Sequence, residues 1–286
     1  MVTRPVLPFA IPLFVPADRP ERFEKAAAAG ADAVILDLED AVAADAKDAA
    51  RAALRSGFGS VPIIVRVNGL GTPWHAADMA ALAGHGFAAV MVPKAEAGEP
   101  FSSLCGASPV PVVALVESAR GLADARRIAE TSNVTRLAFG SIDFCADIGC
   151  MHTRDALLVA RSELVLASRL AGLVAPVDGV TTSIGDAGAI SADARHALDL
   201  GFGGKLAIHP RQIVPIRAGL APDEAEIAWA RKVLASGDGA AAVDGAMVDE
   251  PVRIRARTIL SRQMEPPPGG LIRQAKDDCH EDPGAR

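Results

Sequence analysis

Residues 112–118 read VVALVES, and residues 137–144 read LAFGSIDF. Each stretch is an apolar run typical of a buried strand. Glu117 stands where the first apolar run stops, and Asp143 stands where the second stops. Because the carboxyl ends of consecutive parallel strands meet at one edge of a sheet, we expect both carboxylates to point at the same place. Two carboxylates converging in this way suit Mg²⁺, which completes its shell with waters and substrate.

With these two, eight stretches of this kind recur along the chain. The apolar runs, rich in Val, Ile and Leu, are residues 11–16, 33–38, 63–67, 89–93, 112–117, 136–140, 176–181 and 204–209. Ala-rich stretches with charges at helical spacing lie between them, as in residues 20–29, 43–55, 119–130, 154–173 and 191–200. Alternating strands and helices indicate a parallel sheet covered by helices. Eight repeats in about 210 residues predict a (β/α)₈ TIM barrel, an α/β fold.

The C-terminal part of the chain exceeds what a barrel requires. Two further helical patterns, at about 222–235 and 250–262, are separated by a Gly/Asp-rich segment, 236–239, which we expect to be a hinge. The arm is expected to cap the barrel or to pack on a neighbouring subunit. The predicted organisation is a barrel domain over 1–220, a C-terminal helical arm over 221–263, and a disordered polar tail over 264–286.

Composition excludes several classes of protein. Half of the 286 residues are hydrophobic, which permits a sizeable core, yet no apolar run approaches the roughly 20 residues of a membrane helix. The N-terminus lacks the features of a signal peptide, so we expect a cytoplasmic protein. A formal net charge of −6 with interleaved acids and bases argues against nucleic-acid binding. The four cysteines, Cys105, Cys145, Cys150 and Cys279, lack Cys-x-x-Cys spacing, which predicts reduced thiols rather than a zinc site or disulfide framework.

Polar residues recur where the predicted strands end, as the barrel rule demands of an active site. They are Asp37, Glu39, Asp40, Arg66, Asn68, Lys94, Glu117, Asp143, Thr181, Thr182 and His209. Glu117 and Asp143 are candidate metal ligands. The alternative is that each caps the following helix, but capping does not need an acid after both neighbouring strands.

Arg66 offers a planar fork for a substrate carboxylate, and it is equally suited to an ion pair with Asp37 or Glu39 that holds the barrel mouth together. The two interpretations are compatible. Asp37 and Glu39 share a side under strand alternation, whereas Asp40 should point differently. Near a divalent ion, Asp37 and Glu39 would hold metal-bound waters; otherwise the three acids form an ordinary solvated loop.

Lys94 and His209 each have two interpretations. Lys94 could be a Schiff-base nucleophile, but a carboxylate metal site makes that role redundant, and pairing with an acid or the substrate is favoured. His209, in the run Ile208-His209-Pro210, is either a base or an anchor of its loop.

Several segments, in order, resemble the citrate lyase β-subunit-like family of the HpcH/HpaI aldolase/citrate lyase group. The resemblance covers about Leu13 to Leu260 and is carried by residues 13–23, 36–41, 66–68, 92–94, 116–118, 139–140 with Asp143, 208–210 and 244–249.

The resemblance implies a Mg²⁺-dependent carbon–carbon lyase that cleaves or forms a 3-hydroxyacyl-CoA thioester, such as malyl-, citramalyl- or citryl-CoA. The products of cleavage would be an acyl-CoA and an oxo acid. By the same resemblance, Glu117 and Asp143 bind the metal and Arg66 binds the oxo acid. Asp249 would be the acid/base residue, reaching into a neighbouring subunit of a homotrimer or a dimer of trimers.

The resemblance also places Arg19 and Lys25 where relatives contact CoA phosphates. One departure concerns the same ligand: many relatives carry Arg-Ser where this chain has Ile11 and Pro12. A different thioester carrier or a different acid therefore stays open. The competing functions are a CoA-independent aldolase of 4-hydroxy-2-oxo acids, whose members usually lack the arm with its Asp, and a citrate lyase β-type subunit that acts only in a complex with an acyl-carrier protein.

Overall fold

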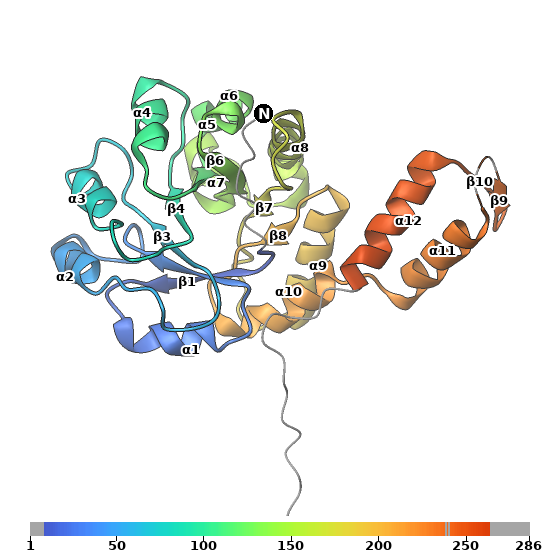
Figure 1. Cartoon of the computed structure of the whole chain (residues 1–286), viewed down its shortest axis with the longest axis horizontal. Coiled ribbons are helices and arrows are strands. Elements are labelled where there is room, and N and C mark those ends of the chain that lie inside the picture. Colours follow the sequence, from blue (N-terminus) through green and yellow to red (C-terminus); the bar gives the residue numbers. More distant parts are fainter. Residues whose placement is uncertain (1–8, 238, 240, 264–286) are drawn as a thin grey trace, which may run out of the picture.

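The computed structural model describes residues 9–237, 239 and 241–263, and the predicted tail lies outside them. Within these residues, eight parallel strands form one sheet in chain order (Figure 1). They are β1 (Pro12–Pro16), β2 (Ala33–Asp37), β3 (Ile63–Arg66), β4 (Ala89–Val92), β5 (Val112–Val116), β6 (Val134–Phe139), β7 (Val177–Asp178) and β8 (Gly204–Lys205). Ala207 N donates to Pro12 O at 3.0 Å and Phe14 N donates to Ala207 O at 2.9 Å, so the segment that follows β8 pairs with β1. The predicted (β/α)₈ barrel is confirmed.

The strands are apolar throughout because both of their faces are buried. One set of side chains fills the barrel interior, and the alternate set packs against the surrounding helices. The interior set includes Ile35, Ile64, Met91, Val113, Leu115, Ala138, Val177 and Leu206. This two-sided burial explains why the sequence shows continuous apolar runs instead of a simple alternation.

The helices of the barrel are mostly short. They are η1 (Pro20–Arg22), α1 (Phe23–Ala27), η2 (Ala44–Ala46), α2 (Lys47–Ala52), α3 (His75–Ala80), α4 (Glu99–Ala107), α5 (Ala119–Ala123), α6 (Ala125–Glu130), α7 (Ser141–Ile148), α8 (Arg154–Leu170), α9 (Ala187–Asp199), η3 (Pro210–Gln212) and α10 (Ile213–Leu220). The longest, α8, begins where Thr153 accepts a hydrogen bond from Ala156 N, and it buries Leu157, Leu164 and Ala167 at helical spacing. None of the described helices has both the length and the apolar character needed to span a membrane.

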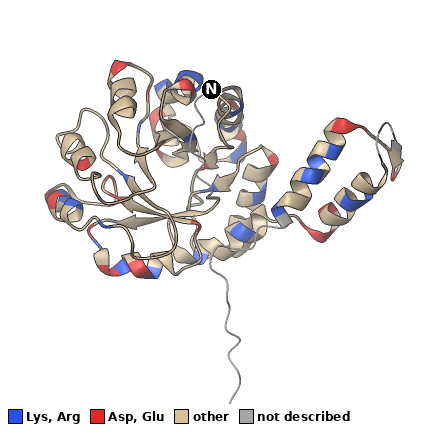
Figure 2. Ribbon diagram, in the orientation of Figure 1, with Lys and Arg blue, Asp and Glu red and all other residues tan. Residues whose placement is uncertain are grey.

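The C-terminal residues form an arm of two helices, α11 (Glu224–Ala235) and α12 (Glu250–Gln263). The two helices contact each other through a small core that includes Val233, Val248 and Ile259. Figure 1 shows the arm projecting from the side of the barrel near α9 and α10, and Figure 2 shows acidic and basic side chains distributed along its helices.

The segment between the two arm helices contains a feature that the sequence interpretation missed. Beyond the predicted hinge at 236–239, β9 (Ala241–Val243) and β10 (Ala246–Val248) pair as an antiparallel hairpin at the far end of the arm (Figure 1). Its turn residues, Asp244 and Gly245, have φ values of 50° and 81°. An Asp-Gly pair with two positive φ angles is the signal of a two-residue hairpin turn, so the sequence did contain the information.

The last two predicted strands were too long. The runs at 176–181 and 204–209 contain only two strand residues each, Val177–Asp178 and Gly204–Lys205. The chain leaves β7 at Gly179, whose close contact with the Ser141 side chain leaves no room for a Cβ. Leu206 and Ala207 are buried although they lie beyond β8, so burial there does not mark strand structure.

Candidate active site

The carboxyl ends of the strands surround a cavity of about 380 Å³. Four predicted site residues line it: Asp37, Arg66, Glu117 and Asp143. Asp40, Gly140 and Ser141 line it too, and apolar side chains form the rest of its walls. These side chains are Phe14, Pro16, Ala41, Leu115, Phe139, Ile142, Val180, Leu206 and Ile208. The structure therefore brings the central acid–arginine group of the prediction together.

Glu117 directly follows β5 and is only 2% exposed. Its Oε1 accepts a hydrogen bond of 2.8 Å from Lys94 N, while Oε2 has no hydrogen-bond partner among the described residues. Ser118, not Glu117, caps α5, because Ser118 Oγ accepts from Gly121 N at 3.0 Å. The cap interpretation of Glu117 is therefore wrong, and one carboxylate oxygen is left for another ligand.

Burial, together with the charges of Glu39 and Asp143, raises the pKa of Glu117 to about 8, although the Lys94 N–H and Arg66 act to lower it. A buried carboxyl with an unpartnered oxygen and other acids near it is an unfavourable arrangement without a positive charge. The position depends on Gly140, because a Cβ at that residue would collide with the Glu117 carboxylate. Glu117 and Asp143 thus offer the oxygen donors that Mg²⁺ prefers.

Asp143 does not end a strand, contrary to the prediction. β6 ends at Phe139, Gly140 precedes the next helix, and Asp143 lies half-buried in the first turn of α7. The reason is that the helix begins immediately at Ser141, so the apolar run LAFGSIDF is part strand and part helix. Asp143 makes no side-chain cap on α7, whose N-cap residue is Gly140. A carboxylate in a first helical turn is also stabilised by the helix dipole.

Arg66 is buried and held by a two-pronged contact to Asp37. Its Nε and Nη2 lie 2.7 and 2.6 Å from the two oxygens of Asp37, and its Nη1 lies 3.1 Å from Glu39 Oε2. The guanidinium lies over the ring of Phe14, 4.8 Å from its centroid. Although burial alone would lower it, Asp37 and Glu39 raise the pKa of Arg66 above its usual range. The predicted ion pair is confirmed, and substrate contact, which would use the Nη1 side, stays a prediction.

The acidic segment after β2 is organised, not an ordinary solvated loop. Asp37 and Glu39 are buried, and Asp37 Oδ1 accepts from Glu39 N at 2.9 Å. The side chain of Asp40 is 56% exposed, in line with its expected different direction, although it reaches within 3.8 Å of Arg66 Nη1. The role of Asp37 and Glu39 toward metal-bound waters stays a prediction.

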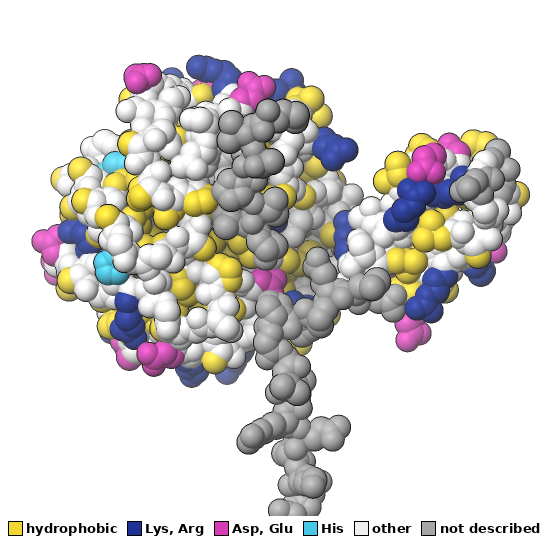
Figure 3. Space-filling model, viewed as in Figure 1, with side chains coloured by type: hydrophobic (Ala, Val, Ile, Leu, Met, Phe, Trp, Pro, Cys, Tyr) yellow, Lys and Arg dark blue, Asp and Glu magenta, His cyan; other side chains and the backbone are white. Residues whose placement is uncertain are grey.

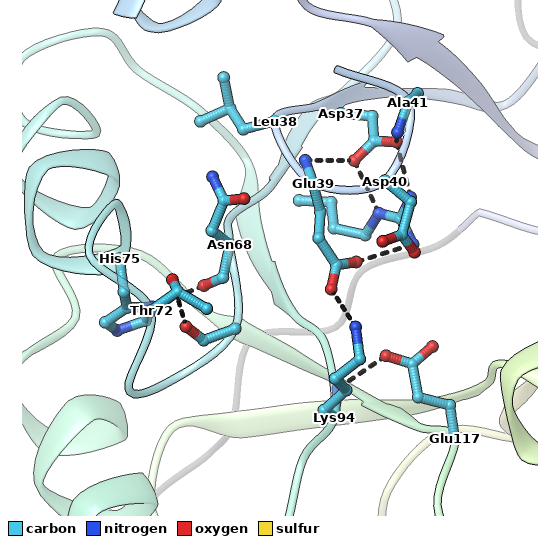
Figure 4. A network of polar contacts seen from close by, with 12 residues as sticks. Asp37, Leu38, Glu39, Asp40, Ala41, Asn68, Thr72, His75, Lys94 and Glu117 are labelled. Carbon is cyan, nitrogen blue, oxygen red and sulfur yellow. Dashed lines mark hydrogen bonds and ion pairs between the residues drawn. The ribbon is translucent and has the colours of Figure 1, made fainter. Parts of the chain in front are cut away.

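Lys94 connects two of the acids. Figure 4 shows it between Glu39 and Glu117, with its ammonium group 2.5 Å from Glu39 Oε1 and its main-chain N–H bonded to Glu117. Its backbone has a positive φ of 48°, which an L-residue adopts at a cost. Burial lowers the pKa of Lys94, but the pairing with Glu39 outweighs burial and raises it. A charged amine is a poor nucleophile, so these contacts favour the pairing role over the Schiff base.

Four other predicted residues lie outside this cavity. His209 anchors its loop, since its Nδ1 accepts from Arg211 N at 3.2 Å at the start of η3. Arg19 lies just before η1 and Lys25 lies on α1. Both side chains are exposed, and they line neither this cavity nor the neighbouring one at the same end of the barrel. Asp249 precedes α12, where its Oδ1 accepts from Val252 N at 3.4 Å, and it follows the hairpin at the far end of the arm.

A second cavity, of about 790 Å³, opens at the same end of the barrel and shares Asp40 with the first. Its walls come from the segments after β2, β3 and β4 and include Lys47, Trp74 and Lys94. Lys47 Nζ donates to the carbonyl oxygens of Leu38 and Glu39, each at 2.7 Å, and so fixes the acidic segment between the two cavities.

Three features of the site were missed in the sequence. Gly140 could have been singled out, because a glycine between a strand and an acid often permits close backbone approach. The ring of Phe14 under Arg66 has no local signal. The contact of 2.9 Å between Ser141 Oγ and His152 Nε2 joins residues eleven apart in an irregular segment, so periodicity could not reveal it.

Comparisons with known proteins agree with this geometry. Residues 10–210 match the family model described as HpcH/HpaI aldolase/citrate lyase. A citrate lyase subunit beta-like protein from Mycobacterium tuberculosis is 43% identical over 264 residues, covering 88% of this chain and 95% of the relative. A (3S)-malyl-CoA thioesterase from Cereibacter sphaeroides is 34% identical over 270 residues, covering 89% and 94%.

The fold comparison gives the same result. The crystal structure of CitE from Mycobacterium tuberculosis, in complex with magnesium, acetoacetate and coenzyme A, matches with a TM-score of 0.81 and 41% identity, covering 90% of this chain and 98% of that one. The shared barrel, the family model and relatives matched over nearly their whole length lead to one conclusion: this chain is a lyase of the HpcH/HpaI aldolase/citrate lyase family.

Proposed function

We propose that this protein is a Mg²⁺-dependent carbon–carbon lyase that cleaves or forms a 3-hydroxyacyl-CoA thioester, with an acyl-CoA and a small oxo acid as the other reaction partners. The observation that carries the proposal is one cavity in which Glu117 has an unpartnered buried oxygen, Asp143 lines the wall close enough to raise the pKa of Glu117, and Arg66 supplies a buried positive charge. Such a cavity suits an anionic oxo acid held between a cation and a guanidinium.

The donor set fits magnesium. Glu117 and Asp143 would hold the ion, and two carboxylates leave room for waters and for substrate oxygens. When bound, Mg²⁺ supplies a Lewis acid that polarises the substrate carbonyl or hydroxyl. The structure of CitE from Mycobacterium tuberculosis with magnesium, acetoacetate and coenzyme A supports this assignment.

Arg66 orients the carboxylate of the oxo acid through its Nη1 side. Its other two donors are fixed by Asp37, so the guanidinium is held in one direction before substrate arrives. The apolar walls, including Phe139 and Ile142, exclude water from the space beside the two acids. Asp37 and Glu39 would hold waters bound to the metal, and Lys94 balances the negative charge of Glu39.

The cavity of about 380 Å³ is too small for a whole CoA thioester, and the adjoining cavity of about 790 Å³ offers the additional room. Arg19 and Lys25 line neither cavity, so their assignment to the CoA phosphates rests on the family resemblance alone. Thr181 and Thr182 have no role in the proposed reaction.

Asp249 is the proposed acid/base residue, and it acts in the active site of a neighbouring subunit. It moves a proton to or from the α-carbon of the thioester, next to the carbonyl group, where the enolate forms or collapses. The trans arrangement is supported by the position of Asp249 at the far end of an arm that projects from its own barrel (Figure 1). Figure 3 shows hydrophobic side chains on the arm surface, and Met247 and Ile254 there are 72% and 54% exposed. Exposed apolar groups beside the catalytic acid suit packing in a homotrimer or dimer of trimers.

The experiment is a panel of oxo acids incubated with acetyl-CoA or propionyl-CoA, with and without Mg²⁺, and read by mass spectrometry. One or more 3-hydroxyacyl-CoA products should appear only with Mg²⁺. If products form from oxo acids and aldehydes without any CoA ester, the protein is a CoA-independent aldolase. If no free acyl-CoA reacts but an acyl-carrier protein restores turnover, the chain is a subunit of a larger lyase.

Hydrolysis is a second candidate, favoured by the similarity to a (3S)-malyl-CoA thioesterase. It is distinguished in the same experiment when a 3-hydroxyacyl-CoA is supplied alone. Cleavage of the carbon–carbon bond releases an oxo acid and an acyl-CoA, whereas hydrolysis releases the hydroxy acid and free CoA.

A further inference from the structure

Two cysteines lie against each other beside the candidate active site. Cys145 Sγ and Cys150 Sγ are 3.4 Å apart, although neither is part of a Cys-x-x-Cys motif. A disulfide needs an S–S distance of about 2.05 Å, so a small movement of either side chain would allow the bond to form. All three cysteines within the described residues are free thiols.

The backbone holds this pair together without help from a disulfide. Cys145 lies in the last turns of α7, and Gly149 ends the helix in the left-handed conformation with φ of 70°. The chain then turns so that Cys150 N donates to Cys145 O at 3.1 Å. The two thiols are therefore neighbours because of a defined helix end, not through a chance contact of mobile side chains.

The two thiols differ in access to solvent. Cys150 is partly exposed, whereas Cys145 is buried behind it. This is the arrangement of an outer sulfur that meets an oxidant and an inner sulfur that resolves the product. Cys105 provides a contrast within the same chain, because it is a fully buried residue of α4.

The pair is mechanically linked to the cavity. α7 carries Ser141, Ile142 and Asp143 on the cavity wall, and Cys145 lies only two residues further along the same helix. Beyond Cys150, His152 Nε2 lies 2.9 Å from Ser141 Oγ and so ties the following loop back to the start of α7. A disulfide between Cys145 and Cys150 would therefore shift the segment 141–152, whose two ends are joined by the contact between Ser141 and His152.

We propose that Cys145 and Cys150 are a reversible redox site that a peroxide converts to a disulfide, and that the disulfide displaces α7 and weakens cation binding by Asp143. The Cys150 sulfur attacks the peroxide oxygen, which breaks the O–O bond and gives a sulfenic acid and water. The Cys145 sulfur then attacks the Cys150 sulfur, the S–S bond forms, and the hydroxyl group leaves with the Cys145 proton as a second water. Two thiols are oxidised and one hydrogen peroxide is reduced; a dithiol reductant reverses the change by exchange.

The first measurement concerns the bond itself. Trypsin cleavage after Arg136 and Arg154 places both cysteines in one peptide, 137–154, which contains no other cysteine. After mild peroxide treatment of the full chain and blocking of free thiols, this peptide should lose the mass of two hydrogen atoms and take up no blocking group. Dithiothreitol should restore two blockable thiols. Oxidation of Met151 in the same peptide adds an oxygen atom and is distinguished by mass.

Variants identify the partners. Cys150→Ser and Cys145→Ser should each abolish the disulfide, and the matched control Cys105→Ser should leave it unchanged. If Cys145→Ser fails to fold, Cys150→Ser, at the more exposed position, provides the same test. A peptide that keeps two blockable thiols, or one in which Cys150 proceeds to sulfinic acid without a disulfide, overturns the proposal.

The second measurement is Mg²⁺ binding by calorimetry on reduced and oxidised protein, and this part rests on the proposed metal site. The oxidised wild type should bind Mg²⁺ at least about threefold more weakly, with recovery on reduction, while oxidised Cys150→Ser should bind like the reduced wild type. Equal affinities in both states overturn the link between the disulfide and the cavity. If reduced protein binds no Mg²⁺, the proposed function fails and the link fails with it, whereas the disulfide is still judged by the peptide mass.

Discussion

Lys94 and Glu117, which follow neighbouring strands β4 and β5, are joined by a main-chain hydrogen bond of 2.8 Å from Lys94 N to Glu117 Oε1. This hydrogen bond engages Oε1 and leaves Oε2 of Glu117 without a hydrogen-bond partner among the described residues. The same site contains two further acids, Asp143 and Glu39, which raise the pKa of Glu117. The charge on Glu117 is therefore costly in the protein alone and favourable beside a cation.

Glu117 should make the metal-free protein less stable as the pH rises. Below the unfolded-state pKa of 4.5 both states carry the proton; between 4.5 and about 8 the folded protein keeps it and the unfolded chain loses it. The folded state then binds more protons, so the free energy of unfolding falls across that window and levels off above about 8. Glu117→Gln should remove the effect and stabilise the metal-free protein at pH 8 by a few kcal/mol. Denaturant unfolding at several pH values, with chelator present, measures both; an unchanged pH profile in the variant would contradict the assignment.

Asp143→Asn should lower Mg²⁺-dependent turnover by at least about a hundredfold while leaving the fold intact, because an amide is a weak ligand for a hard cation. Turnover, Mg²⁺ affinity and the melting temperature are measured together. Asp155→Asn is the matched control, since Asp155 is an exposed acid in the first turn of α8. Wild-type metal affinity in the Asp143 variant would exclude this residue as a ligand.

Arg66→Lys should lower both stability and kcat/KM. The charge remains, but the two-pronged contact to Asp37 is lost, at a cost of roughly 1–3 kcal/mol for a buried charged hydrogen bond. Arg161→Lys is the control, because Arg161 makes a similar buried pair with Asp178 and lines neither cavity. The control should lose stability and keep KM for the oxo acid. An effect of Arg66→Lys on kcat/KM below about twofold would leave Arg66 with a structural role alone.

Gly140→Ala should weaken Mg²⁺ binding by about tenfold or more, because the added Cβ pushes the Glu117 carboxylate out of position. Gly106→Ala, in α4, is the control: a Cβ there meets nothing within 4 Å. Calorimetric titration with Mg²⁺ compares the two variants. Equal affinity in Gly140→Ala and in the control would show that Glu117 does not need the observed orientation.

Asp249→Ala and Asp143→Ala should each be inactive alone and should partly complement when the two proteins are mixed and reassembled. Some interfaces would then pair an intact metal site with an intact Asp249. Sedimentation and a tag on each variant verify that mixed oligomers have formed. A monomeric protein, or mixed oligomers without recovered activity, would remove the trans role and leave Asp249 as the cap of α12 seen in the hydrogen bond from Val252 N.

The sequence by itself determined the barrel and the edge at which its chemistry lies. Runs such as Val112–Val116 are apolar on both faces because they are buried on both faces, and that property is written in the local composition. Polar residues such as Arg66 and Glu117 could be recognised in the sequence because they stand at the ends of these apolar runs. The Asp244-Gly245 turn was visible too, but its two flanking strands of three residues are too short to stand out by pattern.

Only the tertiary structure decided how those polar groups pair. The contact of Arg66 with Asp37, the hydrogen bond of Lys94 to Glu117, the fit of Gly140 against the same carboxylate and the closeness of Cys145 to Cys150 are set by how strands and helix ends meet. Asp143 shows the limit most clearly, since an apolar run with an acid after it reads the same whether the acid ends a strand or opens a helix. Whether a residue is buried can be predicted from the pattern of apolar residues around it in the sequence. The partner of a buried charge is different, because it depends on groups far away in the chain that come near only when the barrel closes.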